Sequence, residues 1–245
     1  MSTMGKKDKL IEAYQEFTRW ITPDIIEILQ VVAVDISKGT RALVVYPSGK
    51  VMEDIIRKFD SRLSGYGFCG LEHFKRDKGG KTGREKYLEI FGNVLSSHEE
   101  KFVHVKAYRK SAKHVFRDHF YSFLKAGNMF IVDKNYLPWI NIDVLNMLYP
   151  HTEIIEEMRY FKLFNTTDGP IVVIAEDVIQ SNCDNPESES CEYECEFPVN
   201  ITYKGFLMSD NLANFCRRLL EDYNNIASDN LRSLKEFAKT LTVRR

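Results

Sequence analysis

Apolar residues recur every three or four positions in several stretches of the chain, and this spacing predicts amphipathic helices. The first is expected at residues 6–20, with further helices at 51–63, 84–96, 111–125 and 141–148. Thr22, Pro23 and Asp24 have the composition of a helix start, so a short helix is expected there as well. Ser209 and Ser228 are expected to cap two helices that close the chain. About seven helices are expected to flank the sheet.

Runs of β-branched or alternating residues separate these helices and predict strands. Gln30–Asp35 and Arg41–Tyr46 are expected to form one β-hairpin, because Lys38-Gly39 supplies a turn between them. Tyr160–Phe164 and Pro170–Ala175 are expected to form a second hairpin around an Asp-Gly turn.

Single strands are expected at 103–107, 129–133 and 197–207. Two hairpins and single strands interleaved with helices predict an α/β or α+β fold with a mixed sheet. The whole chain, residues 1–245, is expected to form a single compact domain.

Acidic residues stand at the ends of three apolar predicted strands. Asp35 follows Val-Val-Ala-Val, Asp133 follows Phe-Ile-Val, and Glu176 and Asp177 follow Val-Val-Ile-Ala. Acids also end strands simply because they suit turns. Carboxylates delivered by adjacent strand ends can instead converge on Mg²⁺ or Mn²⁺, which prefer oxygen ligands. The pattern therefore predicts metal ligands at Asp35, Asp133 and Glu176, and catalytic roles for these three residues and Asp177.

The first predicted hairpin, within residues 29–50, resembles the opening of ribonuclease-H-like nucleases. In both, an acid ends the first strand and a turn leads into the second. The resemblance implies a third strand directly afterwards, whereas the apolar spacing predicts a helix at 51–63 in that position.

Charged residues are strongly sorted along the chain, although the net charge is only −1. Residues 75–117 form a basic segment with twelve Lys/Arg against five Asp/Glu. Residues 168–197 contain nine Asp/Glu and no Lys or Arg, and include an acidic, Cys-containing loop at 180–196. Such sorting is informative about binding partners and not about the fold.

Aromatic rings lie among the cations of the basic segment, a composition typical of proteins that bind phosphates and bases together. The rings also suit the buried faces of the two helices predicted there. The residues expected to bind nucleic acid are Lys75, Arg76, Lys78, Lys81, Arg84, Arg109, Lys110 and Lys113.

The cysteines and the hydropathy of the chain indicate in which cellular compartment the protein is expected. The five thiols, an odd number, are expected to stay reduced, because the chain shows no secretory signal. A zinc site made by Cys183, Cys191, Cys195 and Cys216 would lack paired Cys-x-x-Cys spacing. No apolar run approaches the roughly 18 residues of a membrane span. An intracellular protein, cytoplasmic or nuclear and without a membrane partner, is expected.

The sequence is compatible with two different functions. One is a nucleic-acid-binding protein that acts as a divalent-metal-dependent nuclease through its strand-end carboxylates. The other is a non-catalytic adaptor or structural protein that forms homo-oligomers by docking its basic segment on the acidic loop 184–196 of another copy.

Overall fold

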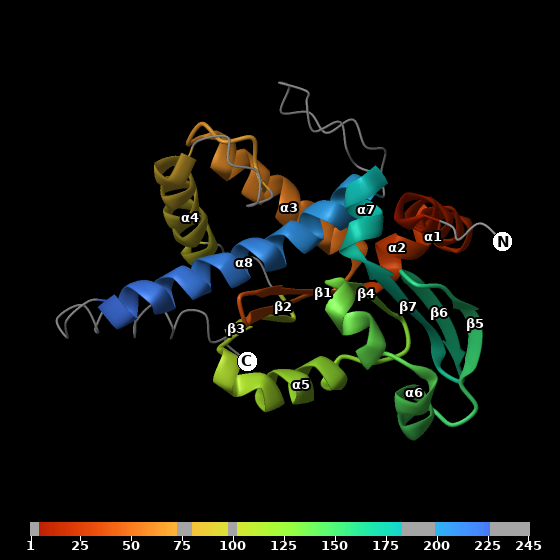
Figure 1. Cartoon of the computed structure of the whole chain (residues 1–245). Coiled ribbons are helices and arrows are strands. Elements are labelled where there is room, and N and C mark those ends of the chain that lie inside the picture. The colour runs from red at the N-terminus through yellow and green to blue at the C-terminus, as the bar shows by residue number, and fades with distance from the viewer. Residues whose placement is uncertain (1–4, 73–79, 98–101, 183–198, 226–245) are drawn as a thin grey trace.

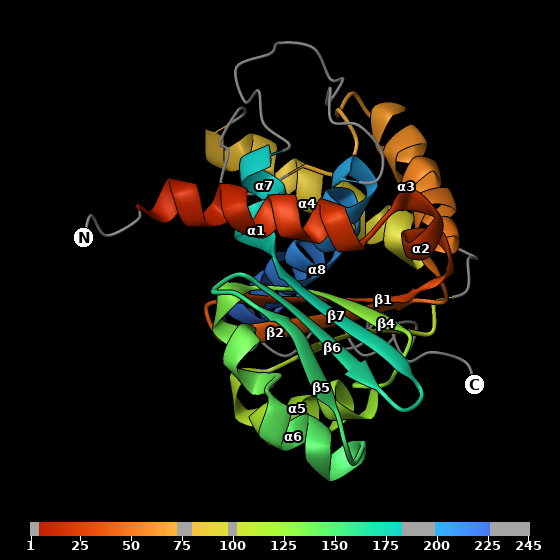
Figure 2. The ribbon, with the colours of Figure 1, turned by 90° about the vertical axis from the view of Figure 1, so that its right-hand side faces the viewer.

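The structure is a computed structural model that describes residues 5–72, 80–97, 102–182 and 199–225. These residues form a seven-stranded mixed sheet with helices on both faces (Figures 1 and 2). The predicted α/β or α+β class is therefore confirmed, including its mixed sheet.

The sheet has the strand order β3-β2-β1-β4-β7-β6-β5. Its strands are β1 (Gln30–Ser37), β2 (Thr40–Tyr46), β3 (His104–Tyr108), β4 (Asn128–Val132), β5 (Glu153–Glu157), β6 (Phe161–Thr166) and β7 (Gly169–Ala175). The three central strands β1, β4 and β7 run parallel to one another. The pairs β1/β2 and β6/β7 are antiparallel hairpins, so both predicted hairpins are confirmed.

Helices cover the sheet unequally on its two faces. They are α1 (Lys6–Trp20), α2 (Pro23–Ile28), α3 (Gly49–Ser64), α4 (Gly80–Ser96), α5 (Lys113–Ser122), α6 (Ile142–Leu148), α7 (Glu176–Asn182) and α8 (Val199–Asn225), with 3-10 helices η1 (Lys110–Ala112) and η2 (Lys134–Trp139). Helix α8 crosses one face together with α1, α3, α4 and α7, and α5 and α6 lie on the other (Figures 1 and 2). Strands enclosed on both faces must be apolar throughout.

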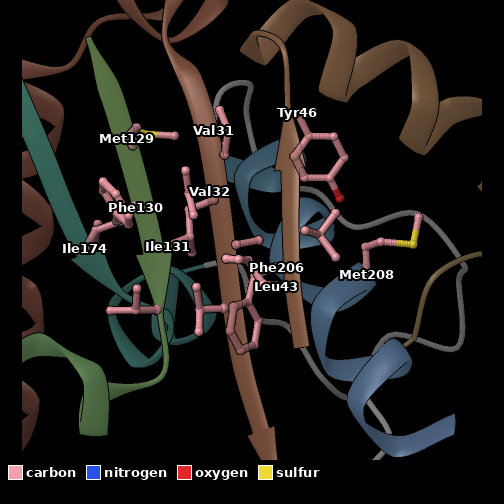
Figure 3. Packing of buried hydrophobic residues seen from close by; sticks show 14 of the residues in the cluster. Val31, Val32, Leu43, Tyr46, Met129, Phe130, Ile131, Ile174, Phe206 and Met208 are labelled. Atoms are coloured by element: carbon pink, nitrogen blue, oxygen red, sulfur yellow. The ribbon is translucent and has the colours of Figure 1, made fainter. Parts of the chain in front are cut away.

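The main core lies between the central strands and α8. Residues 31–34 of β1 and all of β4 are buried, as are Phe206 and Met208 of α8, the helix that packs on β1 and β2 (Figure 3). The hydroxyl of Tyr46 donates to the Gly205 carbonyl at 3.1 Å, which ties β2 to α8. A Cβ at Gly205 would clash with the Met52 sulfur, so a larger residue there would force Met52 to shift.

The predicted strand at 197–207 is wrong, because residues from Val199 onward belong to the long helix α8. Ser209, the expected cap, is buried inside this helix, and its hydroxyl donates to the Phe206 carbonyl three residues earlier. A β-branched start made the segment look extended, but packing on β1 and β2 selects the helix. The helix expected after Ser228 lies outside the described residues.

The strand predicted at 103–107 is confirmed as β3, which pairs antiparallel with β2. The helix predicted at 51–63 is confirmed as α3, and α3 and α4 stand between β2 and β3 in the chain, where the ribonuclease-H-like resemblance implies a third strand directly. Two further elements, β5 and α7, were not predicted. Strand β5 (Glu-Ile-Ile-Glu-Glu) is a largely exposed edge strand, so it lacks the alternating apolar pattern of a half-buried one.

Candidate metal centre

The parallel register places three acids in one row across the central strands. Val34 of β1 pairs with Val132 of β4, and Val132 pairs with Ala175 of β7. One residue further along each strand stand Asp35, Asp133 and Glu176. Since the three strands are parallel neighbours, their carboxyl ends meet at the same edge of the sheet.

The three side chains converge as well as their backbones. One carboxylate oxygen from each of Asp35, Asp133 and Glu176 lies within 4.8 Å of the others. Asp35 is 5% exposed and Glu176 is 7% exposed, while Asp133 is half-buried. Like charges at this separation repel strongly in a site with little water, and a divalent cation would offset that repulsion.

Asp133 is held in place by the start of η2. Its Oδ1 accepts hydrogen bonds from the backbone N–H of Asn135 at 2.8 Å and from the Asn135 side-chain amide at 2.6 Å. These bonds cap the 3-10 helix and fix the orientation of the carboxylate. The acid therefore also has the structural role that strand-end acids commonly have.

A buried arginine and a buried tyrosine stand close to the acid row. Arg41 lies on β2, where its guanidinium covers the Phe116 ring at 5.8 Å and Nη1 donates to the Gly39 carbonyl at 3.1 Å. Burial raises the pKa of Tyr136, the nearby charge of Arg41 opposes this, and the charges of Asp133 and Asp35 add to it. Arg41 thus supplies positive charge beside the carboxylates.

Asp177, the fourth predicted catalytic acid, is placed differently from the other three. Its Oδ2 lies 3.2 Å from Lys6 Nζ and 3.3 Å from Lys134 Nζ. Burial alone would raise the pKa of Asp177, but the hydrogen bonds and charges of the two lysines lower it below its usual value. Asp177 is an ion-pair partner at the border of the acid row.

A hydrogen-bond network links the end of β1 to α8. Ser37 Oγ donates to Asn214 Oδ1 at 2.8 Å and accepts from Arg217 Nε at 3.2 Å. The Asn214 amide donates to Asp210 Oδ1 at 3.0 Å. Asp210, which is buried, is a polar residue that sequence reasoning missed. Its signal in the sequence is that it lies one helical turn after Phe206 and Leu207 and one turn before Ala213, all of them apolar.

The predicted nucleic-acid-binding residues fall into two groups. Arg109, Lys110 and Lys113 follow β3, whose carboxyl end lies at the same edge of the sheet as the acid row, because β3 and β1 both run antiparallel to β2. These three side chains are exposed, and Lys110 lies against the β1–β2 turn, where a Cβ at Gly39 would be 3.2 Å from Lys110 Cγ.

The second group lies in or near α4. Arg84 is half-buried on this helix, which packs against α3 and α8. Lys81 is in the first turn of α4, and its side chain is outside the description. Lys75, Arg76 and Lys78 also lie outside the described residues, as does the acidic loop 184–196 of the self-association hypothesis.

The cysteines differ in part from the expectation that all the thiols stay reduced. Cys69 is disulfide-bonded, which corrects that expectation, because sequence spacing does not reveal which sulfurs the fold brings together. Cys216 is a free thiol, and burial raises its pKa to about 12. Cys183, Cys191 and Cys195 lie outside the described residues.

No protein-family model, curated protein or solved structure matches this chain. Within the described residues, none of the helices is long and apolar enough to cross a membrane.

Proposed function

We propose that this protein is a divalent-metal-dependent nuclease whose metal ligands are Asp35, Asp133 and Glu176. The observation that carries the proposal is the convergence of three strand-end carboxylates within 4.8 Å, two of them almost fully buried. Three oxygen ligands of this kind suit Mg²⁺ or Mn²⁺. A bound ion of this class would polarise a phosphodiester and lower the pKa of a water molecule beside it.

The chain's own residues have separable roles in this proposal. Asp35, near the end of β1, and Glu176, at the start of α7, supply two ligands, and Asp133 supplies a third whose orientation is fixed by the N–H of Asn135. Arg41 lies beside the row and compensates part of its negative charge. Arg109, Lys110 and Lys113, at the same edge of the sheet, attract the polyanionic substrate.

Nucleic acid is the substrate class that this charge arrangement favours. Cations around a cluster of acids attract a substrate that is itself anionic, and phosphodiesters are the substrates for which carboxylate-held divalent ions are commonly used. The antiparallel β1-β2-β3 arrangement beside parallel β4 also extends the ribonuclease-H-like resemblance beyond the first hairpin.

Thermal melts with and without millimolar Mn²⁺ test the metal site directly. At a concentration one hundred times the dissociation constant, Mn²⁺ should stabilise the wild type by about 2.7 kcal/mol, or roughly 5–10 °C for a chain of this size. Asp35→Asn and Asp133→Asn should abolish that shift. Each should also abolish cleavage of single- or double-stranded DNA or RNA by the Mn²⁺-loaded protein.

Asp168→Asn is the matched control, because Asp168 is an exposed acid in the turn at the opposite end of β7. This variant should keep both the Mn²⁺ shift and cleavage. A wild type whose melt does not respond to Mn²⁺ and that cuts none of the substrates would disprove the proposed function.

A further inference from the structure

Two lysines from distant parts of the sequence share one carboxylate oxygen beside the acid row. Lys6 begins α1 and Lys134 begins η2, and both ammonium groups lie within 3.3 Å of Asp177 Oδ2. Helix α1 lies alongside α7, which carries Asp177 (Figure 2). We call these three residues the lysine clamp.

The lysine clamp carries an excess of positive charge that remains accessible. Two ammonium groups around one carboxylate leave the lysine clamp itself with a net charge of about +1. The Lys6 and Lys134 side chains are 63% and 50% exposed, whereas that of Asp177 is 13% exposed. The carboxylate is covered, and the two cations are presented to solvent.

Stability alone is a poor explanation for this arrangement. Exposed ion pairs contribute little because water and salt screen them and both side chains lose conformational freedom. Two ammonium groups that share one oxygen also repel each other. A second anion placed between them would relieve this repulsion, and a phosphate offers several oxygens for that purpose.

The position of the lysine clamp indicates which anion it serves. Lys134 directly follows Asp133, and Asp177 directly follows Glu176, so the clamp lies one residue beyond the acid row at the same edge of the sheet. A nucleic acid whose scissile phosphate lies at the acid row would bring a neighbouring phosphate of the same strand to this border.

We propose that Lys6 and Lys134 bind a backbone phosphate of the nucleic acid next to the one at the acid row, and that Asp177 is a positioning residue that holds the two lysines. This inference rests on the proposed function for the identity of the ligand. The recognition is of phosphate and therefore independent of base sequence.

The test measures binding without metal, so that it is separate from catalysis. Fluorescence anisotropy of a short labelled oligonucleotide, single- or double-stranded, is recorded in EDTA between about 50 and 200 mM salt, the range over which phosphate contacts are most visible. For each phosphate contact, raising the salt over this range lowers the affinity by a factor of about three. Lys134→Gln and Lys6→Gln should each weaken binding severalfold at low salt and reduce the salt dependence by about one contact, while Lys134→Arg should retain both.

Matched controls stand close by in the chain. Lys125 is an exposed lysine at the opposite end of β4 from Lys134, and Lys7 is an exposed neighbour of Lys6 in α1. Lys125→Gln and Lys7→Gln should leave the affinity and the salt dependence close to wild type. Unchanged melting temperatures for all these variants show that folding is intact, as expected for exposed lysines.

The possible results separate the two proposals. If Lys134→Gln and Lys6→Gln bind like their controls, or if the wild type binds neither oligonucleotide, the lysine clamp is not a phosphate site, whatever Mn²⁺ does to the melt. If the clamp variants lose binding but Mn²⁺ leaves the wild-type melt unchanged, the phosphate site stands and the nuclease proposal fails.

Discussion

The polar residues at the two ends of the parallel strands β4 and β7 differ in kind: they are neutral and hydrogen-bonded at the amino end, and charged and clustered at the carboxyl end. At the amino end, Asn128 is buried, and its amide donates to Gln30 Oε1 at 3.1 Å and to the Phe123 carbonyl at 2.7 Å. In the β6–β7 turn, the Thr166 hydroxyl donates to the Gly169 carbonyl and accepts from the Asp168 N–H. These are hydrogen bonds between neutral groups, within and between the strand connections.

At the carboxyl end, the same strands bring negatively charged side chains close together in the acid row. Asp133 and Glu176 stand with Asp35 of β1 in a row, and the lysine clamp stands beside them. Hydrogen bonds that satisfy buried polar groups stabilise a fold, whereas clustered carboxylates destabilise it. The polar groups at the amino end therefore stabilise the fold, whereas the clustered carboxylates at the carboxyl end cost stability, as is common at functional sites.

The largest expected effect separates two neighbouring acids at the carboxyl end. Glu176→Gln should remove the entire Mn²⁺-dependent stabilisation, about 2–3 kcal/mol at saturating metal, because it removes one of three ligands. Asp177→Asn should retain that stabilisation, because Asp177 pairs with Lys6 and Lys134 instead. Parallel melts with and without Mn²⁺ measure both, and loss of the shift in Asp177→Asn would place that acid among the ligands.

The next effect compares the two ends of β4 in metal-free protein. Asn128→Ala should lower the free energy of unfolding by about 2 kcal/mol, because it leaves the Phe123 carbonyl and the Gln30 side chain without their donor. Asp133→Asn should instead raise it by about 1 kcal/mol, since it removes one of three repelling charges. Urea denaturation in EDTA checks the two signs, and a destabilised Asp133→Asn would mean that its cap on η2 outweighs the repulsion.

The smallest effect concerns a titratable group at the amino end of β3. Burial, with the charges of His119 and Lys106, lowers the pKa of His104 to about 4. Between that value and the ordinary pKa near 6.5, the unfolded chain binds the proton and the folded one does not. This contribution to stability is therefore complete above about pH 6.5 and is lost as the pH falls to about 4, by about 1–2 kcal/mol for a half-buried group.

Denaturation of the wild type and of His104→Gln between pH 4 and 7 measures this contribution as a difference. His104→Gln should flatten the pH dependence, whereas His114→Gln, at an exposed position on α5, should not. Equal slopes for the wild type and His104→Gln would show that His104 takes up its proton in the folded protein as readily as in the unfolded chain.

Many helices and strands of the fold could be predicted from local patterns in the sequence. The hairpin β1/β2 was predictable because a two-residue turn with positive φ at Lys38 and Gly39 joins two β-branched runs. The amphipathic helices α1, α3 and α5 were predictable because apolar residues repeat along one face. The first half of α8 was wrongly predicted as a strand, because the structure of a β-branched run depends on the residues that it packs against.

The candidate site likewise has a part that the sequence predicted and a part that it did not. The sequence by itself determined that Asp35, Asp133 and Glu176 directly follow buried apolar runs, because such runs can be recognised from local composition. Only the tertiary structure decided that these strands are β1, β4 and β7 in adjacent positions, that their register aligns the acids, and that Asp177 pairs with Lys6 instead. The physical reason is that strand order and register come from pairing between residues far apart in the chain, which no local pattern specifies.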